Sequence, residues 1–275
     1  IGALLQADNG KLYGVTKKGG DHDMGVLYQY EPVNNIFAVL KHFDGANIGA
    51  EPHKGPVQAS NGKIYGACFK GGNQDKGTLY EYDVDLNSIN RIHDFTGSPD
   101  GEFPNCRLID AGSGMLYGTT ELGGISNLGT IFKYDLNLDA LSIVYEFSGN
   151  DGKFPMCRIL QHTNGYFYGI TSGGGNADRG TLFRFNPVSN ELNKLTDFHG
   201  EDYGEIPRSS PVSGPNDNIF VMTYTGGAFG NYCILYEFDT QENIFDKKFD
   251  FGASENGAVP RGGLCLANDG MVSFS

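Results

Sequence analysis

One pattern returns along this chain at a nearly constant period, and it constrains the fold more than any other feature. A Tyr-Gly dipeptide begins at Tyr13, Tyr65, Tyr117 and Tyr168, and Phe220 stands in the fifth place, so the steps are 52, 52, 51 and 52 residues. Each dipeptide is followed by a Gly-Gly pair, a second aromatic residue and a Gly-x-x-Pro step. A chain with this periodicity is built from tandem copies of one structural unit.

Each repeat contains four short apolar runs that are separated by turn residues. In the second repeat the runs are GPVQA (55–59), KIYGACF (63–69), GTLYEYD (77–83) and SINRIHDF (88–95). The segments between them contain Asn, Asp and Gly, which tolerate the positive φ angles of hairpin turns. We therefore expect each repeat to form a four-stranded antiparallel sheet. Such a sheet cannot bury both of its apolar faces alone, so successive sheets should stack as the blades of a β-propeller.

The repeats predict a single all-β domain over residues 1–275, a β-propeller with six blades favoured and five or seven as alternatives. Repeat boundaries fall at about 1–51, 52–103, 104–154, 155–206 and 207–259, and a partial repeat occupies 260–275. The partial repeat matches the first two strands of a unit, and two strands from upstream of Ile1 would complete it as a sixth blade. We expect the glycine of each Tyr-Gly to let a neighbouring blade approach, and the Gly-Gly pair to end its strand in a sharp bend.

Charge and cysteine content exclude several classes of function. The chain has 20 Lys and Arg against 33 Asp and Glu, a formal net charge of −13, so a nucleic acid would be repelled. No apolar run approaches the roughly 20 residues that cross a bilayer, so no membrane insertion is expected. The five cysteines show no CxxC spacing, which argues against a zinc site and a disulfide framework and favours small buried side chains. Whether Cys106 and Cys157, which are equivalent in adjacent repeats, are reduced is left open.

The pattern YGxTxxGGxxxxGTLFxY, followed by an aromatic residue and GxxPxxxL, resembles the GloVer-type tandem-repeat family of bacteria, the choice-of-anchor tandem-repeat proteins. The resemblance covers essentially the whole chain and weakens in the fifth repeat, where FVMTYTGG and YCILYEF replace the usual motifs. It implies a secreted or surface-displayed bacterial protein and supplies no catalytic residues. A looser similarity to Kelch blades also indicates a propeller, although this chain lacks the Trp expected of such blades.

Binding is expected on the rim where the Gly-Gly loops and the Gly-x-x-Pro loops emerge together, because propellers usually hold ligands there. Residues that break the repeat on this rim are the candidates, since structural demands are shared among repeats. The candidates are Tyr203, Tyr224, Phe229, Tyr232, Arg107, Arg158 and Arg208. The aromatic residues would stack on sugar rings or hold a protein side chain; the alternative is that they pack a divergent blade.

The three arginines would hold a carboxylate or a sulfate of a ligand by paired hydrogen bonds. The alternative is that each pairs with an acidic residue of its own surroundings. The nearby acids are Asp100, Glu102, Asp151 and Glu205.

No linear motif of a known catalytic centre occurs in the sequence. The oxygen-rich turns 83–87 and 135–139 resemble a calcium loop but lack its downstream Glu and Gly, so we expect no metal and no cofactor. The sequence favours a non-catalytic extracellular binding or adhesion module for a glycan or a protein, present as a monomer within a larger chain. One alternative is a propeller glycosidase or lyase that uses Glu121 and Asp178, and another is a purely structural repeat of a surface protein.

Overall fold

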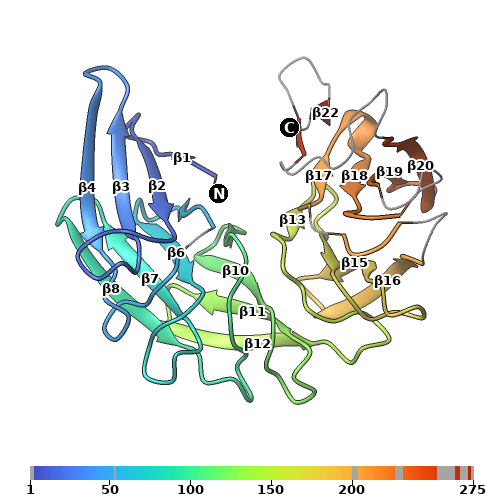
Figure 1. The fold of residues 1–275 in the computed structure, drawn as a ribbon, viewed down its shortest axis with the longest axis horizontal. Helices are drawn as coiled ribbons and strands as arrows, with labels where there is room; N and C mark the ends of the chain where they lie inside the picture. Colours follow the sequence, from blue (N-terminus) through green and yellow to red (C-terminus); the bar gives the residue numbers. More distant parts are fainter. Residues whose placement is uncertain are drawn as a thin grey trace. The chain divides into compact units, whose positions relative to one another are not determined.

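The computed structural model is an all-β structure built from repeated sheets (Figure 1). It describes residues 3–52, 54–199, 204–207, 209–226, 232–252, 264–266 and 272–273. These residues form five four-stranded antiparallel sheets and one two-stranded sheet, and the strand order in each sheet follows the sequence. The prediction of a four-stranded antiparallel sheet in each repeat is thus confirmed. The chain divides into two compact units, 1–146 and 147–275.

The first compact unit contains three sheets. The strands of the first sheet are β1 (Leu5–Gln6), β2 (Leu12–Thr16), β3 (Val26–Glu31) and β4 (Ile36–His42). Those of the second sheet are β5 (Val57–Gln58), β6 (Ile64–Cys68), β7 (Thr78–Asp83) and β8 (Ser88–Asp94). Those of the third sheet are β9 (Ile109–Asp110), β10 (Met115–Thr120), β11 (Thr130–Asp135) and β12 (Ala140–Glu146).

The second compact unit contains the fourth and fifth sheets and a strand pair. The strands of the fourth sheet are β13 (Leu160–Gln161), β14 (Phe167–Thr171), β15 (Thr181–Asn186) and β16 (Glu191–Asp197). Those of the fifth sheet are β17 (Val212–Ser213), β18 (Ile219–Met222), β19 (Ile234–Asp239) and β20 (Ile244–Asp250), with the short 3-10 helix η1 (Pro215–Asp217) before β18. The strands β21 (Cys265–Leu266) and β22 (Val272–Ser273) pair with each other. Within the described part of the chain, no helix has the length and hydrophobicity that crossing a bilayer requires.

Successive sheets within each unit pack face to face through large apolar side chains. In the first unit, Leu27 and Phe43 of the first sheet join Tyr80 of the second sheet in one buried cluster. The rings of Phe43 and Tyr80 meet edge to face with centroids 5.3 Å apart. In the second unit, Tyr168 of the fourth sheet and Tyr236 of the fifth belong to one cluster in the same way. Each sheet therefore loses much of its exposed apolar surface only when a neighbouring sheet covers it.

The glycine of each Tyr-Gly makes room for an aromatic ring of its own sheet. Gly118 lies directly opposite Phe132 on the paired strand, and a Cβ at Gly118 would overlap the Phe132 ring. The same pairing recurs between Gly14 and Tyr28, Gly66 and Tyr80, and Gly169 and Phe183. The expectation that this glycine admits a neighbouring blade is corrected: the atoms nearest to it belong to the same sheet.

The fifth sheet, in which the Tyr-Gly motif is lost, solves the same packing problem differently. Val221 replaces the glycine and lies opposite Tyr236. The Tyr236 ring stacks on Phe245 of the adjacent strand, with centroids 4.5 Å apart and planes inclined by 13°. Where the glycine is kept, the opposing ring occupies the space above it; where Val221 replaces the glycine, the Tyr236 ring packs on Phe245.

We predict that Gly118→Ala lowers the free energy of unfolding by about 1–3 kcal/mol, because the added methyl group overpacks against Phe132. The measurement is the denaturant midpoint of the folded chain. The destabilisation should be clearly smaller in a Phe132→Leu background, where the ring is gone. An equal loss in both backgrounds would show that the ring is not what requires glycine at this position.

Candidate functional site

The glycine-pair loops, which join the second strand of a sheet to the third, share one folding device in the first four sheets. An Asp or Asn accepts a hydrogen bond from the amide of the first glycine, at 2.8–2.9 Å in all four loops. The accepting residue has a positive φ, which Asn and Asp tolerate better than most residues. These residues are Asp23, Asp75, Asn127 and Asp178.

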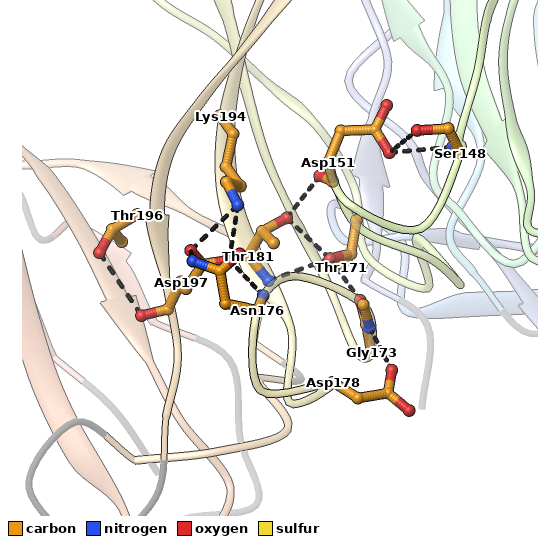
Figure 2. Close-up of polar contacts among 11 residues, drawn as sticks. Ser148, Asp151, Thr171, Gly173, Asn176, Asp178, Thr181, Lys194, Thr196 and Asp197 are labelled. Carbon is orange, nitrogen blue, oxygen red and sulfur yellow. Dashed lines mark hydrogen bonds and ion pairs between the residues drawn. The ribbon is translucent and has the colours of Figure 1, made fainter.

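The fourth sheet shows how the other polar groups of such a loop are used (Figure 2). Asp197, the last residue of β16, accepts hydrogen bonds from the amide and the side chain of Asn176 at 3.1 and 2.9 Å. The same carboxylate is held by Lys194 at 2.9 and 3.0 Å. The hydroxyl groups of Thr171 and Thr181 contact each other at 2.9 Å beneath the loop. These groups fix the shape of the loop.

The two carboxylates proposed for an enzyme, Asp178 and Glu121, are both engaged within their own compact units. Asp178 accepts from the Gly174 amide, and Lys153 lies 2.7 Å from its Oδ1. Lys153 first and then the Gly174 amide lower the pKa of Asp178. Glu121 accepts a hydrogen bond from Asn105 at 3.2 Å. Each carboxylate thus has a structural partner.

The proline loops, which lead from one sheet to the first strand of the next, contain an unusual backbone conformation. The residue before the proline has a φ of 53–57° in all four loops where it is described: Glu51, Phe103, Phe154 and Ile206. None of these is Gly, Asn or Asp, and Ile is β-branched, so the left-handed conformation is costly at these positions. Such conformations persist where the surrounding structure requires them.

Hydrogen bonds explain what holds this residue in place. The Phe103 amide donates to the carbonyl of Lys76 in the preceding glycine-pair loop at 2.8 Å, and the Phe103 carbonyl accepts from the Glu121 amide in the following one at 3.0 Å. In the second unit, Ile206 is bonded in the same way to Arg179 and Tyr224. The residue before the proline therefore ties consecutive glycine-pair loops together. This confirms that the glycine-pair loops and the proline loops lie together.

At two positions of these loops the side chain differs from sheet to sheet, although the main-chain hydrogen bonds are similar. One is the residue before the loop proline, and the other is the residue two places before the first glycine of the pair. We call them the rim positions. In the first unit they are Lys17, Glu51, Phe69, Phe103 and Glu121, and in the second unit Phe154, Ser172, Ile206 and Tyr224. Most of these residues were not predicted from the sequence; the available signal was the variation in residue type beside the fixed Gly and Pro positions of the aligned repeats.

The predicted arginines differ in their surroundings. The Nε group of Arg107 donates to the carbonyl of Pro56 at 3.2 Å, which links the start of the third sheet to the second sheet. Arg158 is exposed, and its backbone amide donates to the Ser210 hydroxyl at 3.2 Å. The two arginines belong to different compact units. Arg208, the third predicted arginine, lies outside the described residues.

The acids that were considered as partners of these arginines are bonded elsewhere. Asp100 contacts His93 at 3.0 Å, and Asp151 accepts from Ser148 at 2.9 and 3.0 Å. Glu102 pairs with Lys76. Glu205 pairs with Arg179.

The predicted aromatic residues also separate into two groups. Tyr224 occupies a rim position and is half-buried, and its amide donates to the carbonyls of Glu205 and Ile206. Tyr232 packs against the buried cluster of Met222, Cys233, Phe251 and Leu264. Tyr203 and Phe229 lie outside the described residues.

The cysteines and acids of the described residues form no metal centre. Cys68, Cys106, Cys157 and Cys233 are buried thiols. Burial raises the pKa of the thiols of Cys68 and Cys106, and it raises that of Cys233 to about 11. No group of three or more His, Cys, Asp or Glu side chains in this part of the chain is arranged to hold a metal ion.

Comparison with known families identifies the repeat. A model described as the Gloeobacter/Verrucomicrobia repeat matches residues 1–210 and 139–273, so the two matches together extend over nearly the whole chain. No curated protein matches the chain significantly.

Solved structures similar to this chain are β-propeller proteins. The extracellular domain of BT3049 from B. thetaiotaomicron has a TM-score of 0.66 at 14% identity, and the similarity covers 99% of this chain and 32% of that one. TolB from Acinetobacter baumannii has a TM-score of 0.54 at 12% identity, covering 90% and 54%. A nidogen/laminin complex gives 0.55 at 12% identity, covering 93% and 81%. At these identities the similarity establishes the propeller-type fold.

We predict that Asp178→Ala destabilises the chain by about 1–2 kcal/mol, because it removes the partly buried hydrogen bond from the Gly174 amide and a residue type that tolerates positive φ. Asp178→Asn should cost clearly less, since Asn127 fills this place in the third sheet. Thermal unfolding and hydrogen exchange of the Gly174 amide provide the measurements. Equal stability of Asp178→Ala and wild type would remove Asp178 from the loop framework.

Proposed function

This chain belongs to the Gloeobacter/Verrucomicrobia repeat family, and from that premise we propose that it is a non-catalytic extracellular binding module that recognises a glycan through its rim of glycine-pair and proline loops. The proposed location outside the cell is supported by the resemblance to secreted and surface-displayed repeat proteins. Within one unit, the ligand would contact side chains at the rim positions, and in the second unit also Arg158.

The contrast between a constant backbone and varied side chains on the rim carries this proposal. A residue needed only for folding would be the same type in every sheet, as the glycines of the pair and the loop prolines are. The rim positions instead carry basic, acidic, aromatic, hydroxyl and aliphatic side chains on similar hydrogen-bonded frames. The left-handed residue before the proline in the four described loops adds support, because backbone strain of this kind clusters at ligand-binding sites.

The aromatic side chains among the rim positions favour a glycan over other ligands. Phe69 and Phe103 stack with ring centroids 5.0 Å apart and planes inclined by 27°. In the second unit, Lys153 lies over the ring of Phe154, 5.3 Å from its centroid. Aromatic faces bind the apolar C–H faces of sugar rings, and adjacent cations bind sugar substituents. The net charge of −13 also disfavours a uniformly anionic surface as a partner. It favours a ligand that is neutral, or whose charged groups meet side chains of opposite charge.

We further propose that the sheets are blades of a six-bladed propeller. The support is the strand pair β21 and β22, which is antiparallel like the first two strands of every complete sheet. The strand β21 also lies beside β17, as β9 lies beside β5 in the first unit.

The first test is a glycan array probed with the folded chain and with the variants Tyr224→Ala and Arg158→Ala. Each variant should lower retention on the responsive glycan by about tenfold or more, because a ring or a charged hydrogen-bond donor at the contact is lost. Both should keep the wild-type melting temperature, because Tyr224 is only half-buried and Arg158 is exposed.

The matched control is Phe37→Ala, which removes a 60% exposed aromatic ring from β4, outside the rim loops. Its retention on the array should equal that of wild type. Tyr232→Ala serves as a packing control and should lower the melting temperature. Absence of any glycan binding by the folded chain, or retention unchanged in both rim variants, would refute the proposed function.

A further inference from the structure

Three lysines gather around one carboxylate on the rim between the first and second sheets. The Nζ atoms of Lys17, Lys18 and Lys70 lie 3.2, 3.7 and 3.6 Å from carboxylate oxygens of Glu51. Their side chains are 53%, 60% and 42% exposed, whereas that of Glu51 is 14% exposed. The cluster therefore presents an excess of two positive charges to solvent around a mostly buried carboxylate.

A stacked pair of rings continues this surface. The Glu51 carbonyl accepts a hydrogen bond from the Phe69 amide at 3.4 Å. Phe69 therefore lies next to the lysine cluster in space. Phe69 stacks in turn on Phe103, and both are half-buried. We call the surface of Lys17, Lys18, Glu51, Phe69, Lys70 and Phe103 the lysine–phenylalanine patch.

The charge of the patch differs from that of other rim loops. In three other rim loops a basic side chain is matched with a single acid: Lys76 with Glu102, Lys153 with Asp178, and Arg179 with Glu205. The chain as a whole has a net charge of −13, which repels a polyanion. An acidic polymer that binds this protein must therefore do so at a local positive surface.

The contacts with Glu51 show that the three lysines bind a carboxylate. Burial alone would raise its pKa, but the hydrogen bond from Lys17 and the charges of the three lysines lower it overall. The ammonium groups thus already stabilise one ionised carboxylate. A second carboxylate, supplied from solvent, finds the same donors on their exposed side.

We propose that the lysine–phenylalanine patch binds uronic-acid residues of an acidic polysaccharide. A sugar ring lies on the Phe69 and Phe103 pair, and its carboxylate is bound by Lys17, Lys18 and Lys70. This inference rests on the proposed glycan-binding function and names the ligand class for the first unit.

The test compares polygalacturonate with its highly methyl-esterified form in affinity gels and titration calorimetry. Both polymers carry the same sugar ring, but esterification removes the negative charge. Binding to polygalacturonate should be at least about tenfold tighter than to the ester at low ionic strength. The difference should shrink as salt rises, because exposed charges are screened.

Variants of the patch have effects of opposite sign. Lys17→Gln combined with Lys70→Gln should weaken binding of polygalacturonate by about fivefold or more. Glu51→Gln should tighten it by about threefold, because an internal competitor for the lysines is neutralised. Phe69→Ala combined with Phe103→Ala should weaken binding of both polymers by about tenfold.

The control is Lys41→Gln combined with Lys133→Gln, which changes the net charge equally but lies in β4 and β11. It should bind as wild type does. Circular dichroism and the melting temperature of every variant show whether it is folded. An equal effect of the two lysine pairs would indicate non-specific attraction and overturn the inference.

Failure of this inference is distinguishable from failure of the proposed function. If polygalacturonate does not bind but another glycan on the array does, the acidic-ligand assignment is wrong and the glycan-binding function stands. If the methyl ester binds as well as the acid, the lysines have no part in recognition. If no glycan binds at all, both proposals fail.

Discussion

Consecutive sheets within each unit are joined at the rim by backbone contacts that leave no room for ordinary residues. A Cβ at Gly71 would fall 2.7 Å from the Cα of Gly49 and 2.8 Å from the amide nitrogen of Ala50 in the preceding proline loop. The residue before the proline must turn into the left-handed region so that its amide and carbonyl reach two different loops. The Gly-Gly pair, the loop proline and the left-handed residue before it are therefore all needed for the same contact between loops. The sheets, their buried rings and the surface on the rim all depend on it.

This arrangement separates the part of the repeat that folds from the part that can vary. The hydrogen bonds that hold Glu51, Phe103 and Ile206 in place are made by the main chain. A main-chain frame tolerates many side chains, provided that the left-handed conformation is enforced from outside the residue. Adjacent rim positions can consequently carry an ion pair in one place and a pair of stacked rings in the next. Repeat proteins that present varied side chains on a constant scaffold use the same division.

Much of the fold could be predicted from the sequence because period, turn residues and apolar runs are local signals. The runs predicted at 63–69 and 77–83 in the second repeat contain β6 (Ile64–Cys68) and β7 (Thr78–Asp83). The role of Gly118 could not be predicted, since the residue that requires it, Phe132, is set by strand register.

The site was less predictable than the fold for the same reason. An X-Pro step suggests an extended residue before the proline, whereas Phe103 has a φ of 57°. The contact of Arg107 with the Pro56 carbonyl joins groups 51 residues apart in sequence. Tyr224 was a candidate because it departs from the repeat, but Phe69 and Phe103 were not singled out, because aromatic residues in a repeat protein are mostly core.

The buried thiols have a practical consequence for the folding of the chain. Cys68, Cys106, Cys157 and Cys233 each belong to a different core cluster. A thiol in such a cluster reacts with an alkylating reagent only when the side chains around it separate. Alkylation rates at the four sites, resolved by peptide mass, would therefore report the opening free energy of each cluster individually. The four thiols are therefore natural probes of whether the repeats unfold independently or cooperatively.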